Sequence, residues 1–99
     1  MIELAIGIIL GCCALGAGIC MGIGAIGPGV GEGHAVANAC EAIGRQPEAK
    51  GAVTSTMIMG CAISETTGIY SLVIAILLIF VAPGMLVNTL TNAIKTLGV

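Results

Sequence analysis

Charged residues interrupt this chain at only a few places and leave two long apolar stretches between them. No Asp, Glu, Lys or Arg occurs from Leu4 to Gly31, and none occurs from Thr66 to Ile94. A membrane-spanning helix needs about 20 predominantly apolar residues. The pattern therefore predicts two membrane-spanning helices, and it leaves no room for four.

The polar positions divide the chain into a helix over about residues 2–44, a loop over about 45–48, a second helix over about 49–81 and a C-terminal extension over 83–99. At about 1.5 Å per residue the first helix exceeds the hydrocarbon thickness of ~30 Å, so it must protrude from the bilayer. Pro83 and Gly84 are expected to end or bend the second helix. The extension keeps helical spacing, with one apolar face predicted at Leu86, Leu90, Ile94 and Leu97.

Composition supports this assignment. The chain of 99 residues is 58% hydrophobic and 8% charged, whereas soluble domains carry about 25% charged residues. We predict an all-α membrane protein, a two-helix transmembrane hairpin forming one domain over residues 1–99. No nucleic-acid partner and no organic cofactor are expected.

A run of glycines lies within the first helix. Gly27 and Gly31 are four residues apart, as are Gly29 and Gly33, so they form two stripes along one helix. Small residues at this spacing let membrane helices approach closely. Two stripes predict a close neighbour on each side and hence a homo-oligomeric ring, while a simple dimer would need only one stripe. Pro28, inside the run, is expected to kink or curve the helix.

The loop carries most of the polar character. Arg45-Gln46-Pro47 and Lys50 form a short basic turn, and the N-terminal region has no basic residue. By the positive-inside tendency the loop is expected to be cytoplasmic, with both termini on the outer side.

Glu65 is the candidate for chemistry, because it is an acid near the middle of an apolar run. An ionisable residue within a membrane span is a functional-site hypothesis. Two hydroxyls follow it, on Thr66 and Thr67, and the phenol of Tyr70 lies five residues on. The alternative is that Glu65 is a buried, protonated packing residue, which would leave the hydroxyl cluster without a purpose.

Glu32 is the second membrane acid and is predicted to lie at the same depth. Counted from the loop, it is about 18 Å along the first helix, and Glu65 is about 25 Å along the second. Side chains lean toward the N-terminus of their own helix, so in a hairpin the two carboxyls converge. Both cannot be ionised there, so one must hold a proton or a cation must neutralise the pair.

The donors available favour an alkali cation. Glu65, Glu32, the Thr66 hydroxyl and the Ile63 carbonyl all offer oxygen, provided that the helix opens slightly at Ile63. A protonated Glu32 can donate to Glu65 while its other oxygen accepts the ion, and Tyr70 can donate its hydroxyl to Glu65. A site for protons alone would need fewer polar ligands. We therefore expect Na⁺, with H⁺ competing when Na⁺ is scarce.

Together these motifs resemble the c subunit, or proteolipid, of F-type ATP synthases. The resemblance extends from the glycine run over Ala25–Gly33, through the loop Arg45-Gln46-Pro47, to Glu65 and Tyr70. The segment over residues 64–71, Ser-Glu-Thr-Thr-Gly-Ile-Tyr-Ser, looks most like the sodium-translocating members.

The resemblance implies a ring of identical hairpins, with the first helix inside and the second outside. Glu65 would carry the ion, with the Thr66 hydroxyl and the Ile63 carbonyl as ligands, in a site shared between neighbouring subunits. Thr67 would hold a water ligand, and Tyr70 would steady the carboxylate. The chain itself would not be an enzyme.

The resemblance also implies partners and a location. The loop Arg45-Gln46-Pro47 would contact the central stalk, formed by the gamma and epsilon subunits. An arginine of the stator's a subunit would release the ion from Glu65. The protein would lie in the bacterial inner membrane, surrounded by lipid.

Two departures from the family pattern and several rivals complete the sequence-based interpretation. The sodium-type pattern usually has Gln at the position of Glu32, and Ala25 replaces the first glycine of the run. The alternatives are a proton-translocating c-ring or a V-type ATPase proteolipid. A small multidrug exporter would need about four spans and aromatic binding residues, and in a passive structural or pore-forming oligomer Glu65 would be dispensable.

Overall fold

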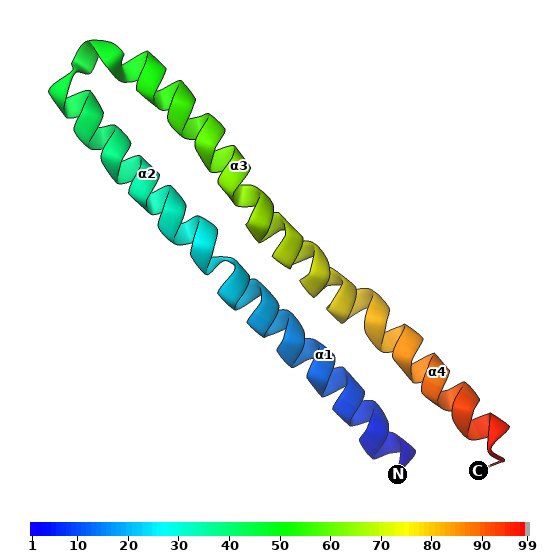
Figure 1. The fold of residues 1–99 in the computed structure, drawn as a ribbon. Coiled ribbons are helices and arrows are strands. Elements are labelled where there is room, and N and C mark those ends of the chain that lie inside the picture. The colour runs from blue at the N-terminus through cyan, green and yellow to red at the C-terminus, as the bar shows by residue number, and fades with distance from the viewer. Residues whose placement is uncertain (99) are drawn as a thin grey trace. The chain divides into compact units, whose positions relative to one another are not determined.

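The computed structural model describes residues 1–98, and all of its regular structure is helical (Figure 1). The chain forms α1 (Ile2–Gly24), α2 (Ile26–Arg45), the 3₁₀ turn η1 (Pro47–Ala49), α3 (Lys50–Ile76), the π-helical turn η2 (Leu77–Val81) and α4 (Ala82–Thr96). The predicted all-α class and hairpin connection are confirmed.

Two compact units make up the described chain. One unit comprises residues 22–71, in which α2 and most of α3 run antiparallel and are joined through Gln46 and η1 (Figure 1). The other comprises residues 1–21 and 72–98, in which most of α1 packs against the end of α3, η2 and α4.

Close contacts between small residues hold the unit of residues 22–71 together. A Cβ built on Gly24 would lie 2.6 Å from the Ser71 Cβ, and one built on Gly31 would lie 3.7 Å from the Ser64 Oγ. Between these two contacts, a Cβ on Gly68 would lie 3.6 Å from the Pro28 Cγ. On one side of these contacts are Gly24, Pro28 and Gly31, and on the α3 side are Ser71, Gly68 and Ser64. On both sides the residues are three or four positions apart, so they share one face of the helix. We call this line of contacts the seam.

The second unit also has a core of small side chains. Cys13, Ala17 and Ala75 are buried in it, and a Cβ on Gly16 would lie 3.6 Å from the Leu78 Cδ1. Closely packed small residues favour helix association in lipid, where burial of large apolar side chains gives little gain.

Large apolar side chains face outward in both units. Ile63 is 68% exposed and Phe80 is 77% exposed. Two stretches, Ile2–Arg45 and Pro47–Thr96, are long and apolar enough to cross a bilayer. So much exposed apolar surface needs lipid or further protein against it.

The first helix, predicted over residues 2–44 with a kink or curve at Pro28, is interrupted at Ala25, which separates α1 from α2. Pro28 is the physical cause, because it has no N–H to donate to the Gly24 carbonyl and its ring crowds that carbonyl. Regular bonding resumes at once, with the Gly29 N–H donating to the Ala25 carbonyl at 3.0 Å.

The second helix changes its geometry just before Pro83, near the position where an end or a bend was expected. It widens into η2, where the Ala82 N–H donates to the Leu77 carbonyl five residues back. Pro83 then occupies the first turn of α4, where a missing N–H costs nothing.

The apolar face predicted for the extension is shifted. Leu86 and Leu97 are exposed. The half-buried positions of α4 are Ala82, Pro83, Val87, Leu90, Thr91 and Ile94.

The turn between the long helices is tighter than the predicted loop over 45–48. Gln46 is its one residue outside a helical turn, and its N–H caps α2 by donating to the Ala42 carbonyl at 2.9 Å. Arg45 forms an ion pair with Glu41 one turn earlier. Pro47 opens η1, where its fixed φ suits the first helical position.

We predict that Gly24→Ala destabilises the hairpin by about 1–3 kcal/mol, the usual cost of overpacking, because the new methyl group would overlap Ser71. The measurement is the temperature at which the purified oligomer dissociates, read on gels. Gly22→Ala is the matched control, since nothing lies within 4 Å of a Cβ there. The double variant Gly24→Ala/Ser71→Gly should regain part of the loss; no difference between Gly24→Ala and the control would contradict the seam.

Candidate ion-binding site

The two membrane acids meet within one unit. Glu32 lies on α2 and Glu65 on α3, and their carboxyl groups are close enough to interact directly. Glu32 is half-buried and Glu65 is exposed. The Oε1 atom of Glu32 is buried and finds no hydrogen-bond partner among the described residues. A buried carboxyl oxygen in this position has acceptor capacity left for a further ligand.

The Glu65 carboxyl lies on the side of the seam, close to Gly68, three residues further along its own helix. A Cβ built on Gly68 would lie 3.3 Å from the Glu65 Oε1 and 3.9 Å from its Cδ. Gly68 and Pro28 are both buried, so the carboxyl group lies beside a tight glycine–proline contact between the two helices.

Two of the predicted ligands form a second cluster on α3. The Thr66 hydroxyl donates to the Ile63 carbonyl at 2.7 Å, so their oxygens are adjacent. Each helical residue advances about 100°, which places Ile63, Thr66 and Tyr70 on a side of α3 away from Gly68. α3 is unbroken from Lys50 to Ile76, so the opening expected at Ile63 is absent.

Tyr70 and Thr67 are not part of the pair formed by Glu32 and Glu65. Tyr70 is 69% exposed, and the predicted bond from its hydroxyl to Glu65 is not formed within residues 1–98. Thr67 is exposed, and its carbonyl accepts a hydrogen bond from the Ser71 Oγ at 3.2 Å. A single chain thus brings Glu32 and Glu65 together, and it leaves the side of α3 that carries Thr66 exposed.

The predicted glycine stripes divide between two roles. Among residues 1–98, no atom outside the helix's own backbone lies within 4 Å of a Cβ built on Gly27, Gly29 or Gly33, whereas Gly31 faces Ser64 in the seam. The first three therefore remain available to other copies.

The sequence-based prediction missed the seam around the acids. Pro28 and Gly68 flank the Glu65 carboxyl, and neither was a candidate site residue. The available signal was their spacing, since Pro28 precedes Glu32 by four residues and Gly68 follows Glu65 by three. Both spacings put the pair on one helical side.

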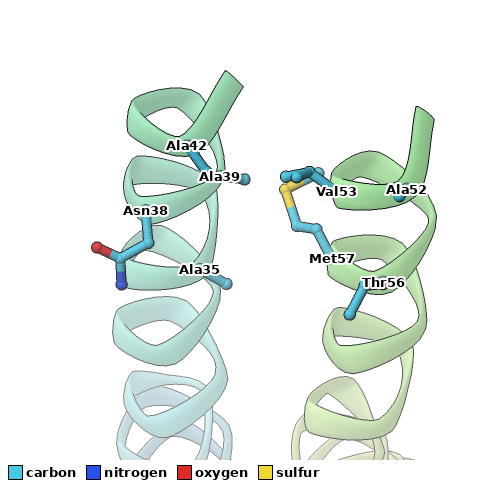
Figure 2. A pocket seen from close by; sticks show the side chains of 8 residues that line it. All are labelled: Ala35, Asn38, Ala39, Ala42, Ala52, Val53, Thr56 and Met57. Atoms are coloured by element: carbon cyan, nitrogen blue, oxygen red, sulfur yellow. The ribbon is translucent and has the colours of Figure 1, made fainter. Parts of the chain in front are cut away.

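Two cavities lie between α2 and α3. One of about 240 Å³ adjoins Glu32, Cys61 and Ser64. The other, of about 420 Å³, lies nearer the turn, where small side chains such as Ala35 and Ala39 face Val53 and Met57 (Figure 2). The cavity nearer the turn has no ionisable side chain in its lining.

The donor chemistry defines the class of site. Among residues 1–98 no three His, Cys, Asp or Glu side chains gather as they would for a transition metal. The arrangement is a carboxyl pair with nearby hydroxyl and carbonyl oxygens, carried on helices that are apolar enough to cross a bilayer. These features are typical of an ion-translocating subunit of a membrane complex.

Comparison with known proteins supports this class of protein. Residues 15–78 match the family model of the ATP synthase C subunit, a range that includes both acids and the turn. The chain belongs to this family.

Relatives from several bacteria are highly similar. The ATP synthase c subunit of Petrotoga mobilis is 58% identical over 69 residues, which are 70% of this chain and 72% of that protein. The protein of the same name from Thermotoga petrophila is 57% identical over 67 residues, covering 68% and 79%. That of Alkaliphilus oremlandii is 54% identical over 76 residues, covering 77% and 85%.

Family membership establishes the coarse function. The protein is an integral membrane subunit, the ion-translocating rotor component of an F-type ATP synthase, and proteins of this family form a ring. It is not a catalytic subunit.

We predict that Glu65 in the purified ring reacts with a hydrophobic carbodiimide at low pH, because such reagents attack protonated carboxyls in apolar surroundings. Peptide mass spectrometry locates the adduct. Glu65→Gln rings should lose the adduct, and Glu48→Gln rings, changed at an exposed acid beside the turn, should keep it. Labelling that persists in Glu65→Gln rings at a comparable rate would show that another carboxyl is the reactive one.

Proposed function

We propose that the ring carries Na⁺ on Glu65, with H⁺ competing when Na⁺ is scarce, and so couples ion flow to rotation and to ATP synthesis or hydrolysis. The observation that carries the proposal is the carboxyl pair of Glu65 and Glu32, to which a neighbouring copy would add the oxygens of its Thr66 and Ile63, which lie next to each other on α3. Hard alkali and alkaline-earth cations prefer oxygen ligands.

Neutrality is the physical requirement for this transport. A bare carboxylate facing hydrocarbon costs several kcal/mol, so Glu65 must pass lipid with its charge masked by a cation or proton. Each ion that crosses contributes about 2.3 kcal/mol per 100 mV, together with its concentration term.

The binding site is completed by a neighbouring copy. Ile63, Thr66 and Tyr70 present exposed atoms on a side of α3 that no part of their own unit covers. Gly27, Gly29 and Gly33 leave open space along α2, which suits the approach of another helix. In the ring, Thr66 and the Ile63 carbonyl would bind the ion, Thr67 would hold a water, and Tyr70 would donate to Glu65.

Glu32 has a helper role in this proposal. As the protonated member of the pair it would donate to Glu65, while its buried Oε1 accepts the ion. Two carboxyls and one monovalent cation remain neutral only if one proton is retained.

The turn and the flanks of the ring provide the contacts for coupling. Arg45, Gln46 and Pro47 are exposed at the turn and would contact the gamma and epsilon subunits of the central stalk. The stator's a subunit would supply the arginine that releases the ion from Glu65. We place the turn in the cytoplasm and both termini on the outer side of a bacterial inner membrane, from the basic residues of the turn.

The test is protection of Glu65 from the carbodiimide. Na⁺ should slow labelling of the wild-type ring, and K⁺ at the same concentration should not. Thr66→Val should raise the half-protecting Na⁺ concentration about tenfold, equivalent to ~1.4 kcal/mol, since it removes an oxygen ligand. Thr89→Val is the matched control, because the Thr89 hydroxyl also donates to a backbone carbonyl, at 2.9 Å. If Na⁺ gives no protection, the ring carries protons.

A separate prediction concerns the second acid. Glu32→Gln should keep Na⁺ protection, because an amide still supplies an oxygen ligand and a donor, while the pH dependence of protection should change, because one proton leaves the coupled pair. The measurement is the half-protecting Na⁺ concentration across a pH series. Complete loss of protection, or a pH series identical to that of the wild type, would refute the helper role of Glu32.

A further inference from the structure

The smaller cavity between α2 and α3 adjoins a buried carboxyl oxygen. The cavity measures about 240 Å³ and is lined by Gly31, Glu32, Ala35, Gly60, Cys61 and Ser64. The Glu32 Oε1 is buried and has no hydrogen-bond partner among residues 1–98. Buried polar atoms in proteins are nearly always hydrogen-bonded, so this oxygen requires a donor.

The Ser64 hydroxyl points toward α2 beside this oxygen. A Cβ built on Gly31, the neighbour of Glu32 in sequence, would lie 3.7 Å from the Ser64 Oγ. Hydroxyls on helices can donate to the carbonyl four residues back, as Thr89 does to Met85 at 2.9 Å. Within residues 1–98 the Ser64 hydroxyl forms no such bond. It is therefore available to donate or accept a hydrogen bond in the cavity.

A water molecule fits the space between these two groups. Glu32 and Ser64 do not hydrogen-bond to each other directly within the described chain. A buried water usually forms two to four hydrogen bonds, and in the liquid a water occupies about 30 Å³. The cavity is larger than that, and its lining offers the Glu32 oxygen, the Ser64 hydroxyl and the weakly donating Cys61 thiol.

We propose that this cavity is a water site, in which one water molecule links the Ser64 hydroxyl to the Glu32 Oε1, and that Ser64 is thereby a positioning residue for Glu32. The inference rests on the proposed function, in which Glu32 helps to bind the ion. With Oε1 held by the water, the other oxygen of Glu32 is directed toward Glu65. An sp² oxygen has two lone pairs, so Oε1 accepts a hydrogen from the water and can still bind the ion.

This water differs from the one proposed at Thr67. Thr67 is exposed and does not line the cavity, whereas the proposed water lies between the two helices of one chain. The water site therefore belongs to the single hairpin, while the Thr66 and Ile63 oxygens come from a neighbouring copy.

The first experiment compares high-resolution structures of purified wild-type, Ser64→Ala and Ser55→Ala rings. Ser55 is the matched control, because it lies on the same helix, is exposed and lines neither cavity. Alanine is the better helix former at both positions, so both variants should assemble. We expect a water between residue 64 and the Glu32 Oε1 in the wild type and in Ser55→Ala, and none there in Ser64→Ala.

Three results of this comparison overturn the proposal. They are a direct hydrogen bond between Ser64 and Glu32 in the wild-type ring, a side chain of a neighbouring copy filling the cavity, and a water that stays in the same place in Ser64→Ala.

A second readout reports on the Glu32 carboxyl itself. The infrared C=O stretch of a protonated carboxyl lies at lower wavenumber when its carbonyl oxygen accepts a hydrogen bond. At low pH, the band that Glu32→Gln rings lack should move to higher wavenumber in Ser64→Ala and stay in place in Ser55→Ala. A purely structural role of Ser64 would not move this band, and an unmoved band in Ser64→Ala overturns the proposal.

The carbodiimide assay separates this proposal from the proposed ion. The half-protecting Na⁺ concentration should rise about threefold in Ser64→Ala, the usual effect of one lost hydrogen bond, and stay unchanged in Ser55→Ala. An unchanged or lowered value in Ser64→Ala refutes the positioning role. Absence of Na⁺ protection in the wild-type ring refutes the proposed ion, and the structures and the infrared band still decide the water site.

Discussion

The cost of a bare carboxylate in hydrocarbon is the constraint on which this structure depends. Several kcal/mol separate an unmasked Glu65 in lipid from a neutralised one, and no basic side chain lies on either long apolar stretch to offset the charge. The structure places the Glu32 carboxyl beside it. A pair of acids can become neutral only by holding protons or a cation, and this requirement turns a helical hairpin into a carrier of ions.

Packing of small residues makes that pairing possible. Gly24 against Ser71, and Gly68 against Pro28, bring the two helices of residues 22–71 close together on the side of Glu32 and Glu65. Since lipid provides no hydrophobic driving force between helices, close backbone approach has to supply it. The same proline that breaks the first helix at Ala25 thus closes the seam beside the Glu65 carboxyl.

Most of the fold could be predicted from the sequence, because hydropathy and charge act locally. The two apolar stretches, the turn near Arg45 and the helical character of the C-terminal region all follow from residue type. Irregularities near Pro28 and Pro83 were expected, but their form, a break at Ala25 and a π-helical turn, could not be predicted, because a proline can be accommodated by a kink, a bend or a widened turn. Neighbouring packing selects among them.

The candidate site, like the fold, could be predicted only in part. The sequence by itself determined that Glu65 and Glu32 are membrane acids at a similar depth, since helical rise depends only on residue number. Only the tertiary structure decided that Glu65 folds over Gly68 and that Thr66 bonds to Ile63 on another side of α3. The physical reason is that rotamers and interhelical distance are set by contacts between segments far apart in sequence, here a glycine meeting a proline forty residues away.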